Sequence, residues 1–240
     1  MPAKPAGPQK QPGPNNQLSR QLTAEFLGSL FLVFTAISPI ILGLQVLQAD
    51  LAVAVLMDAV AVGFVLYVLI ETFGPISGCH INPAVTLALI WLKKMDLKTG
   101  SLYIVVQIVG GLLGTLAAHA MFIGQDYFAW LAVSEVARNG GAFFAEFAGT
   151  FLLILVIFST MVHRHHQAGL IIGLLVGGFL ITTSSTMFAN PQVTIARIFT
   201  WAAAGIRPVD ALGFIAAQLL ATGAAIAIAR LLWGADLNQA

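Results

Sequence analysis

The chain has 240 residues, of which 58% are hydrophobic and only 9% are charged, and its mean hydropathy is +0.90. A soluble domain carries about 25% charged residues, so this composition excludes a soluble enzyme with an ordinary polar surface. A net charge of +1 offers no basic surface to nucleic acid. The single cysteine, Cys79, excludes a disulfide framework and a metal cluster built on cysteines.

Residues 1–20 are expected to form a disordered tail. The first 17 residues hold five of the ten prolines and no aromatic or branched aliphatic side chain. Such a segment buries too little apolar surface to offset the entropy lost on folding. It also lacks the apolar core of a signal peptide.

Six long apolar stretches follow the tail, each close to the 20 residues that a helix needs to cross a bilayer. They are apolar throughout instead of alternating over about ten residues, which argues against a β-barrel. The sequence therefore predicts an all-α membrane protein with six transmembrane helices, over residues 22–46, 51–73, 101–123, 142–162, 168–189 and 209–232.

Two shorter apolar pieces, 82–92 and 190–203, each open with Asn-Pro. Asparagine is a preferred N-cap and proline a preferred first helical residue, so each piece is expected to be a helix that starts at this dipeptide. The first would be about 16 Å long, half of the hydrocarbon core. We therefore predict two re-entrant half-helices.

The distribution of positive charge predicts the topology, because lysine and arginine favour the cytoplasmic side. With six crossings, eight of the eleven basic residues fall on the side of the membrane that carries the N-terminus. The other three are Arg138, Arg197 and Arg207. Both termini are therefore expected in the cytoplasm, and the connecting loop 125–140 outside the cell.

The chain contains an internal repeat. The segment Ala24–Ser29 (AEFLGS) returns as Ala145–Thr150 (AEFAGT), and Asn82–Thr86 (NPAVT) returns as Asn190–Thr194 (NPQVT). Each copy holds three crossings, and an odd number of crossings makes the second copy inverted relative to the first. The predicted repeats are residues 21–124 and 141–240.

Inversion brings the two half-helices in from opposite faces, so that their N-termini meet near the midplane. The stretches before them, 74–81 and 184–189, are expected to be non-helical. Backbone of this kind is tolerated at membrane depth only where it is buried in protein or lines a water-filled path. A polar path through the middle is therefore predicted.

These motifs resemble the major intrinsic protein family, the aquaporins and aquaglyceroporins. The resemblance covers residues 22–233 and is carried by the two AEF-x-G openings and by residues 77–86, SGCHINPAVT. It implies a homotetramer in the cell membrane, with one pore per subunit that passes water or small neutral solutes.

Asn82 and Asn190 are the first candidates for pore residues. Each side-chain oxygen is expected to cap its own half-helix and to leave the amide NH2 as a donor toward the pore; the alternative is plain helix capping. Their neighbours Pro83, Ala84, Pro191 and Gln192 complete the midplane motifs. Gln192 replaces the usual alanine, and the direction of its longer amide stays open.

Glu25 and Glu146 are charges inside predicted spans, where an ionised group needs a partner. The resemblance implies that they hold the re-entrant loops by accepting backbone N–H bonds; a proton relay is the alternative. His80 and Cys79 are expected on the cytoplasmic half of the pore, with a packing role as the alternative for each.

The selectivity filter follows from the resemblance by ungapped counting from the two motif asparagines. This assigns Val62, Gly178, Met187 and Val193, with Val193 where most members have arginine. A wide, apolar gate is expected. Arg197, one helical turn further on, is expected at the extracellular mouth, where it would partly replace the missing arginine. The alternative is that it reaches the interface or pairs with an acidic loop residue.

Asp58 and Glu71 have no counterpart in the other repeat, and the sequence assigns them no role beyond loop support or the vestibule. The sequence shows no nucleophile–base pair, metal-ligand spacing or phosphate-binding loop, so neither an enzyme, a metal nor a cofactor is predicted.

The leading functional hypothesis is a passive channel for water and small neutral solutes, such as glycerol-like polyols and metalloid acids like arsenous acid. A secondary transporter is one alternative, since inverted repeats and broken helices are shared with that class. A structural membrane protein with a closed pore is the other.

Overall fold

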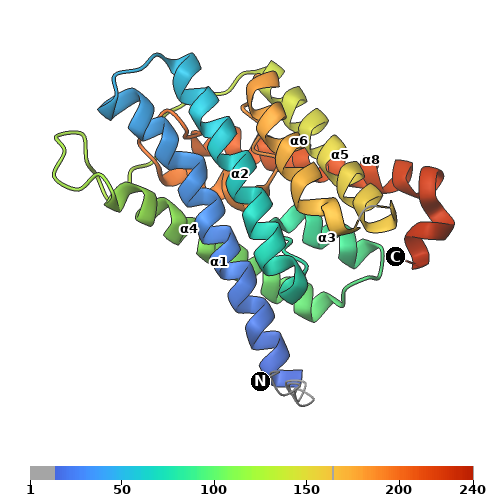
Figure 1. Cartoon of the computed structure of the whole chain (residues 1–240). Helices are drawn as coiled ribbons and strands as arrows, with labels where there is room; N and C mark the ends of the chain where they lie inside the picture. Colours follow the sequence, from blue (N-terminus) through green and yellow to red (C-terminus); the bar gives the residue numbers. More distant parts are fainter. Residues whose placement is uncertain (1–13, 164, 240) are drawn as a thin grey trace, which may run out of the picture.

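The computed structural model describes residues 14–163 and 165–239, and within these ranges the only regular elements are helices. The long helices lie side by side and obliquely in Figure 1. They are α1 (Pro14–Ile41), α2 (Leu51–Ser77), α4 (Leu97–Ala120), α5 (Gly140–His163), α6 (Ala168–Thr182) and α8 (Pro208–Gln239). The short helices are α3 (Pro83–Trp91) and α7 (Pro191–Ala196).

Short irregular turns extend these helices. A π-helical turn, Leu42–Val46, continues α1, and 3₁₀ turns follow α5 and α7 at His165–Gln167 and Arg197–Phe199. Two of the long helices begin at an aspartate that caps them: the Asp50 and Asp96 carboxylates accept hydrogen bonds from the backbone N–H groups of Val53 and Thr99, both at 2.9 Å.

The predicted disorder of residues 1–20 is wrong for part of that range. Residues 1–13 lie outside the described residues, but α1 already begins at Pro14. The apolar stretch from residue 22 therefore extends N-terminally as helix through the polar sequence NNQLSRQ. Polar helix formers continue a helix readily once an apolar segment has nucleated it, because each added residue gains one backbone hydrogen bond.

The fifth predicted span is also too long. In the described residues, five helices are long and apolar enough to cross a membrane, whereas α6 has only 15 residues and ends at Thr182. Residues 183–189 leave the helix and form the loop before α7. Conversely, α2 continues through Pro75 to Ser77, so the non-helical stretch predicted from residue 74 starts only at Gly78.

The second half-helix, expected over 190–203, is shorter than predicted. Its α-helical part ends at Ala196, the 3₁₀ turn reaches Phe199, and the chain is non-helical from Thr200. The first half-helix matches more closely, since α3 ends at Trp91 and Leu92 forms its C-cap.

The helix pairs follow the pattern expected of an inverted duplication. Within the first half α1 packs against α4, and within the second half α5 packs against α8. Across the halves, α2 lies against α6, α4 contacts α7 and α8 contacts α3. Each short helix also contacts a long helix of its own half, α3 with α4 and α7 with α8. Both short helices therefore lie between long helices of the two halves, in the middle of the bundle.

Two glycines allow the close contact between α1 and α4. A Cβ atom at Gly110 would lie 2.5 Å from the carbonyl oxygen of Phe26, and one at Gly114 would lie 2.4 Å from that of Leu30. Backbones of packed helices approach this closely only at small residues. This contact holds α1, which carries Glu25, against α4.

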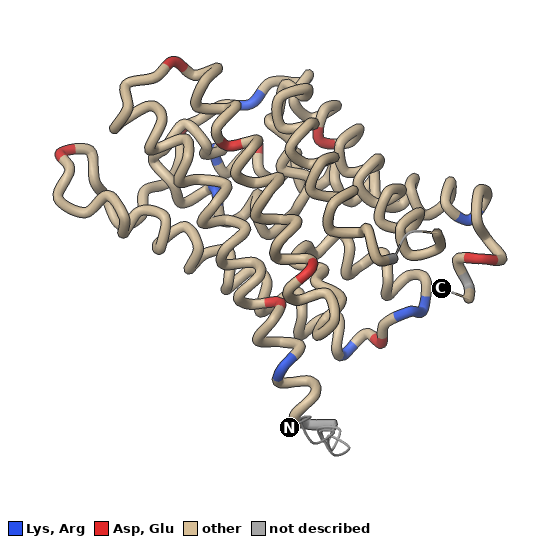
Figure 2. The backbone as a smooth tube through the Cα atoms, in the orientation of Figure 1, with Lys and Arg blue, Asp and Glu red and all other residues tan. Residues whose placement is uncertain are grey.

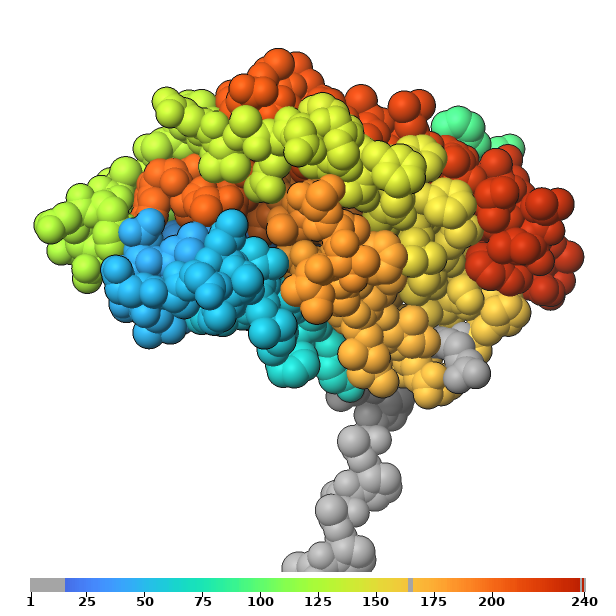
Figure 3. Space-filling view, turned by 90° about the horizontal axis from the view of Figure 1, so that it is seen from above, coloured from blue at the N-terminus to red at the C-terminus, as the bar shows by residue number. Residues whose placement is uncertain are grey.

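The outer surface suits a lipid environment. Charged residues gather mainly at the helix ends and loops, and the sides of the bundle carry few of them (Figure 2). Phe64, Leu212 and Leu231 are 68, 71 and 80% exposed on these sides. At one end, residues 125–139 lie against residues 198–207, with Ser134 N–H donating to Ile198 C=O at 2.7 Å (Figure 3).

Candidate transmembrane pore

A cavity of about 590 Å³ lies between the two halves. Helix α2 contributes Val62, Leu66 and Ile70 to its wall, one residue per helical turn. Helix α6 contributes its residues 168, 172, 176 and 180 with the same spacing. Residues four apart share one helix face, so each of these sets forms an apolar stripe along the cavity. Helix α2 also places the charged Glu71 in the wall.

The assignment of Gly178 to the filter is wrong. It lies between the lining residues Val176 and Leu180 and points to the opposite side of α6, where it is exposed and a Cβ atom would meet nothing within 4 Å. Counting back from Asn190 assumed a fixed loop length, and a shift of two residues turns a helical side chain by about 200°. Leu180 faces the cavity instead.

The two loops that precede the short helices share an unusual backbone. Cys79 and Ile81 have φ angles of 47° and 39°, and Met187 and Ala189, at the matching positions, have φ angles of 34° and 45°. Residues with side chains rarely adopt this left-handed conformation, and such strain persists only where the surroundings enforce it. Both loops must therefore be held by strong contacts.

Glu25 supplies those contacts to the first loop. Its carboxylate is fully buried and accepts hydrogen bonds from the backbone N–H groups of His80 and Ile81 at 2.9 and 2.7 Å. It also accepts from the Ser77 hydroxyl at 2.6 Å and from the Gln107 amide at 2.7 Å. Four donors on one carboxylate satisfy the buried charge.

Glu146 does the same for the second loop. It is also fully buried and accepts from the backbone N–H groups of Phe188 and Ala189 at 2.8 and 2.7 Å. The Gln218 amide donates to it at 2.7 Å and to the Thr194 hydroxyl at 3.0 Å. The two carboxylates thus hold equivalent loops in equivalent ways.

The two motif asparagines meet where α3 and α7 begin. The side-chain oxygens of Asn82 and Asn190 accept from the backbone N–H groups of Ala84 and Gln192, at 2.9 and 3.1 Å, and cap the helices. Their amide nitrogens donate across the junction to the carbonyls of Ala189 and Ile81, both at 2.9 Å. Each NH2 group has two hydrogens, and both residues line the cavity, so one donor of each remains for its contents.

The other motif residues lie behind this wall. Pro83, Ala84, Pro191 and Gln192 are buried and do not line the cavity, unlike the midplane role predicted for them. They form the first turns of α3 and α7, which pack against neighbouring helices. Gln192 donates through Nε2 to the Ile81 carbonyl at 3.3 Å, and its Oε1 has no partner among the described residues.

His80 and Cys79 line the cavity, but both side chains are engaged. Nδ1 of His80 lies 3.1 Å from the Thr86 hydroxyl, and its ring centroid is 5.2 Å from that of Tyr103. The Cys79 thiol donates to the Leu69 carbonyl at 3.4 Å. Each is both a packing residue and part of the wall.

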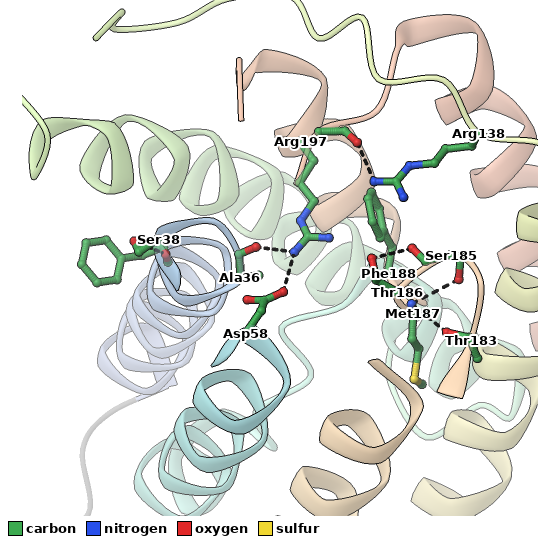
Figure 4. A network of polar contacts seen from close by, with 12 residues as sticks. Ala36, Ser38, Asp58, Arg138, Thr183, Ser185, Thr186, Met187, Phe188 and Arg197 are labelled. Atoms are coloured by element: carbon green, nitrogen blue, oxygen red, sulfur yellow. Dashed lines mark hydrogen bonds and ion pairs between the residues drawn. The ribbon is translucent and has the colours of Figure 1, made fainter. Parts of the chain in front are cut away.

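Arg197 lies deeper than a pore-mouth position implies. It is 2% exposed and lines the cavity (Figure 4). Its Nη2 donates to the Ala36 carbonyl and lies 3.5 Å from Oδ2 of Asp58, and its guanidinium carbon is 4.3 Å from the Phe188 ring centroid. It neither reaches the interface nor pairs with an acidic loop residue; the partner is a residue of α2.

The sequence singles out Asp58 but gives it no role beyond loop support or the vestibule, and its ion pair with Arg197 was missed. The available signal was a lone carboxylate in an apolar span without a counterpart in the other repeat, since such a charge requires a partner. Arg138 was missed as well. It is a loop residue whose backbone N–H donates to Asp210 at 2.7 Å, and whose guanidinium donates to the Gly205 carbonyl and lies 5.3 Å from the Phe188 ring. Burial and the nearby Arg197 charge lower the pKa of Arg138 to about 10, so it stays charged at neutral pH.

Comparison with known proteins identifies this architecture. The family model for the major intrinsic proteins matches residues 14–188. The chain belongs to the major intrinsic protein family. The aquaglyceroporin AqpS of Rhizobium meliloti is 35% identical over 217 residues, which cover 90% of each chain. The aquaporin AqpM of Methanothermobacter thermautotrophicus is 32% identical over 221 residues, covering 76% of this chain and 82% of the relative.

A solved structure agrees with the fold. The aquaglyceroporin of Plasmodium falciparum superposes with a TM-score of 0.63 at 21% identity, covering 91% of this chain and 96% of that one. This likeness confirms the predicted all-α membrane fold, and the family model and the relatives confirm the predicted family. Membership in a family of channels does not favour the transporter or structural alternatives.

Proposed function

We propose that this major intrinsic protein is a passive channel for water and small neutral solutes such as glycerol. The observation that carries the proposal is the pair of Asn82 and Asn190 amides, which face one cavity from opposite halves of the chain. We further propose that it acts as a homotetramer in the cell membrane, with one pore per subunit and both termini in the cytoplasm.

At the centre of the pore, a solute oxygen would accept hydrogen bonds from the free amide hydrogens of Asn82 and Asn190. Helices α3 and α7 both point their N-termini, with their partial positive charge, at this place. That field opposes cations, and the fixed donors orient each passing water so that a continuous proton wire is disfavoured. Neutral molecules with oxygen acceptors meet neither barrier.

The outer filter is formed in this proposal by Val62, Leu180, Met187 and Val193, all of which line the cavity. A valine three residues after Asn190 leaves more room than the arginine of most family members. Apolar walls give little compensation for the dehydration of an ion. The filter therefore suits uncharged solutes, such as glycerol-like polyols and the trihydroxide arsenous acid.

Other residues have supporting roles. We assign Glu25 and Glu146 to holding the strained loops, because both accept backbone N–H bonds from them. His80 and Cys79 line the cytoplasmic half of the pore in this proposal, and Arg197 the outer half. The midplane residues Pro83, Ala84, Pro191 and Gln192 position the two asparagines from behind the wall.

A proteoliposome swelling panel tests the proposal. Vesicles with the purified protein are challenged with water, glycerol, urea and arsenous acid, and empty vesicles serve as the control. We expect fluxes that rise linearly with the solute gradient and do not saturate. Saturation or dependence on a proton gradient would favour a transporter. High water flux with glycerol and urea both excluded would contradict the wide filter.

A further inference from the structure

The outer half of the cavity wall contains one buried ion pair, formed by Asp58 and Arg197. The side chains of both residues are 3% exposed. Arg197 lines the cavity, whereas Asp58 does not and lies behind it (Figure 4). A molecule in the cavity therefore meets the guanidinium first and the carboxylate only at a greater distance.

Three elements hold the guanidinium in place. The Ala36 carbonyl belongs to α1, Asp58 belongs to α2, and the Phe188 ring belongs to the loop before α7. Val62, one turn after Asp58 on the same helix, lines the cavity. The pair therefore lies near the level of the proposed filter, and its anchors draw the arginine toward the wall formed by α1 and α2.

The electrostatics of the pair differ from those of either residue alone. A buried charge without a partner is strongly disfavoured, and removing one member of a buried pair leaves the other uncompensated. Here the two charges sum to zero, so the pair itself adds no net charge to the cavity wall. The remaining dipole has its positive end toward the pore, and at a few ångströms in a poorly screened site this end repels cations.

We propose that Asp58 and Arg197 form a neutral charge filter, in which Arg197 faces the permeating solute and Asp58 is the positioning residue. Asp58 fixes the guanidinium against the wall and cancels its net charge. The filter would exclude cations without concentrating anions, and would leave the cross-section open to neutral solutes. This inference rests on the proposed channel function.

The two single variants should leak ions of opposite charge. In Arg197→Gln the Asp58 carboxylate loses its counter-charge. We expect the leak of sodium ions and protons to rise about tenfold or more, because an unpaired charge beside the cavity changes the energy of a nearby cation by at least the ~1.4 kcal/mol that corresponds to a factor of ten. In Asp58→Asn the guanidinium loses its counter-charge, and we expect a chloride and nitrate leak instead. The double variant Asp58→Asn/Arg197→Gln carries neither charge. Its anion leak should stay near the wild-type value, and its cation leak should lie between those of the wild type and Arg197→Gln, because the repelling positive end is gone but no carboxylate is left unpaired.

The experiment measures ion and glycerol fluxes in proteoliposomes that contain the full chain, with equal protein incorporation checked for each variant. Arg207→Gln is the matched control: Arg207 also forms an ion pair, at 2.7 Å with Asp210, but its side chain is 46% exposed and does not line the cavity. The control should retain wild-type ion exclusion. Glycerol flux in the wild type tests the channel proposal separately from the filter.

Several outcomes would overturn the inference. A single variant with unchanged ion leak in a folded protein removes the charge role. A double variant that leaks as much as Arg197→Gln means that the leak comes from loosened packing. If Arg197→Gln does not fold, the anion leak of Asp58→Asn tests the inference instead. A leak without preference for anions would mean that Asp58 has only a structural role. If wild-type vesicles pass no neutral solute at all, the channel proposal fails and the ion data are not needed.

Discussion

The two halves of this protein hold their loops alike and differ in what they present to the pore. Glu25 and Glu146 accept equivalent backbone hydrogen bonds, and the left-handed residues fall at matching positions. Seven residues after each motif asparagine, however, the first half has Leu89 and the second has Arg197, and both line the cavity. The duplicated features thus fix the backbone of the pore, and an unmatched residue of the second half, Arg197, places a charge in its wall.

The largest effects are expected where the halves agree. Glu25→Gln and Glu146→Gln should each lower stability by about 3–5 kcal/mol, because an amide turns NH2 donors toward groups that already donate. Thermal unfolding in detergent measures this effect, and the two losses should be similar. Glu71→Gln is the control, since Glu71 is exposed. A large loss in one half with none in the other would contradict the equivalence of the two supports.

A smaller effect separates the halves at the midplane, where Gln192 replaces the Ala84 of the first half. A Cβ atom at Gly111 would lie 2.1 Å from Oε1 of Gln192, so Gly111→Ala should destabilise the protein by about 1–3 kcal/mol through overpacking. Adding Gln192→Ala should restore part of this loss.

Gly223→Ala is the control for that cycle, because a Cβ atom there meets nothing within 4 Å and alanine favours a helix. The unfolding temperatures of Gly111→Ala, Gln192→Ala and the double variant measure how strongly the two positions interact. Strictly additive effects of Gly111→Ala and Gln192→Ala would show that the two positions do not interact.

The outer filter should respond to size and charge at Val193. Val193→Arg is expected to reduce glycerol flux about tenfold, the factor that corresponds to 1.4 kcal/mol. Water flux should fall less, because the smaller water molecule still passes a narrowed opening. Val193→Leu adds bulk without charge and should lie between the wild type and the arginine variant. Stopped-flow light scattering on proteoliposomes gives both fluxes. Unchanged glycerol flux in Val193→Arg would place the constriction elsewhere.

The smallest expected effect concerns the matched pair Cys79 and Met187, which line the cavity from opposite loops. A mercurial reagent that reaches Cys79 should lower water flux partially, and Cys79→Ser should be resistant. Met187→Cys in the resistant background should restore inhibition, now from the opposite side of the vesicle. Equal inhibition of the wild type and Cys79→Ser would mean that the reagent acts at another site.

Much of the fold could be predicted from the sequence because its signals are local or repeated. The Asn-Pro dipeptides place the starts of α3 and α7, since both the cap and the first-turn proline are adjacent in sequence. The repeated AEF-x-G segments place Glu25 and Glu146 in matching helices. Composition and segment length suffice for the long membrane helices, because lipid imposes both.

The errors have a different origin. The end of α6 depends on how its loop packs, and apolar loop residues such as Met187 and Phe188 look like a continuing helix. The assignment of Gly178 counts back from Asn190 across the end of α6, which the sequence does not mark. The contact between Asp58 and Arg197 joins residues far apart in the chain, and no periodicity connects them. It appears only once α2 and the 3₁₀ turn that follows α7 have been brought together.

The crossed packing of the short helices has a consequence for synthesis in the cell. Helix α3 packs against α4, which follows it directly, and against α8, which begins only at Pro208. A nascent chain that has inserted its first half therefore holds a short helix that lacks one of its two long neighbours, and an Asn82 amide without the Ala189 carbonyl. The pore can close into its final form only when the last segment arrives.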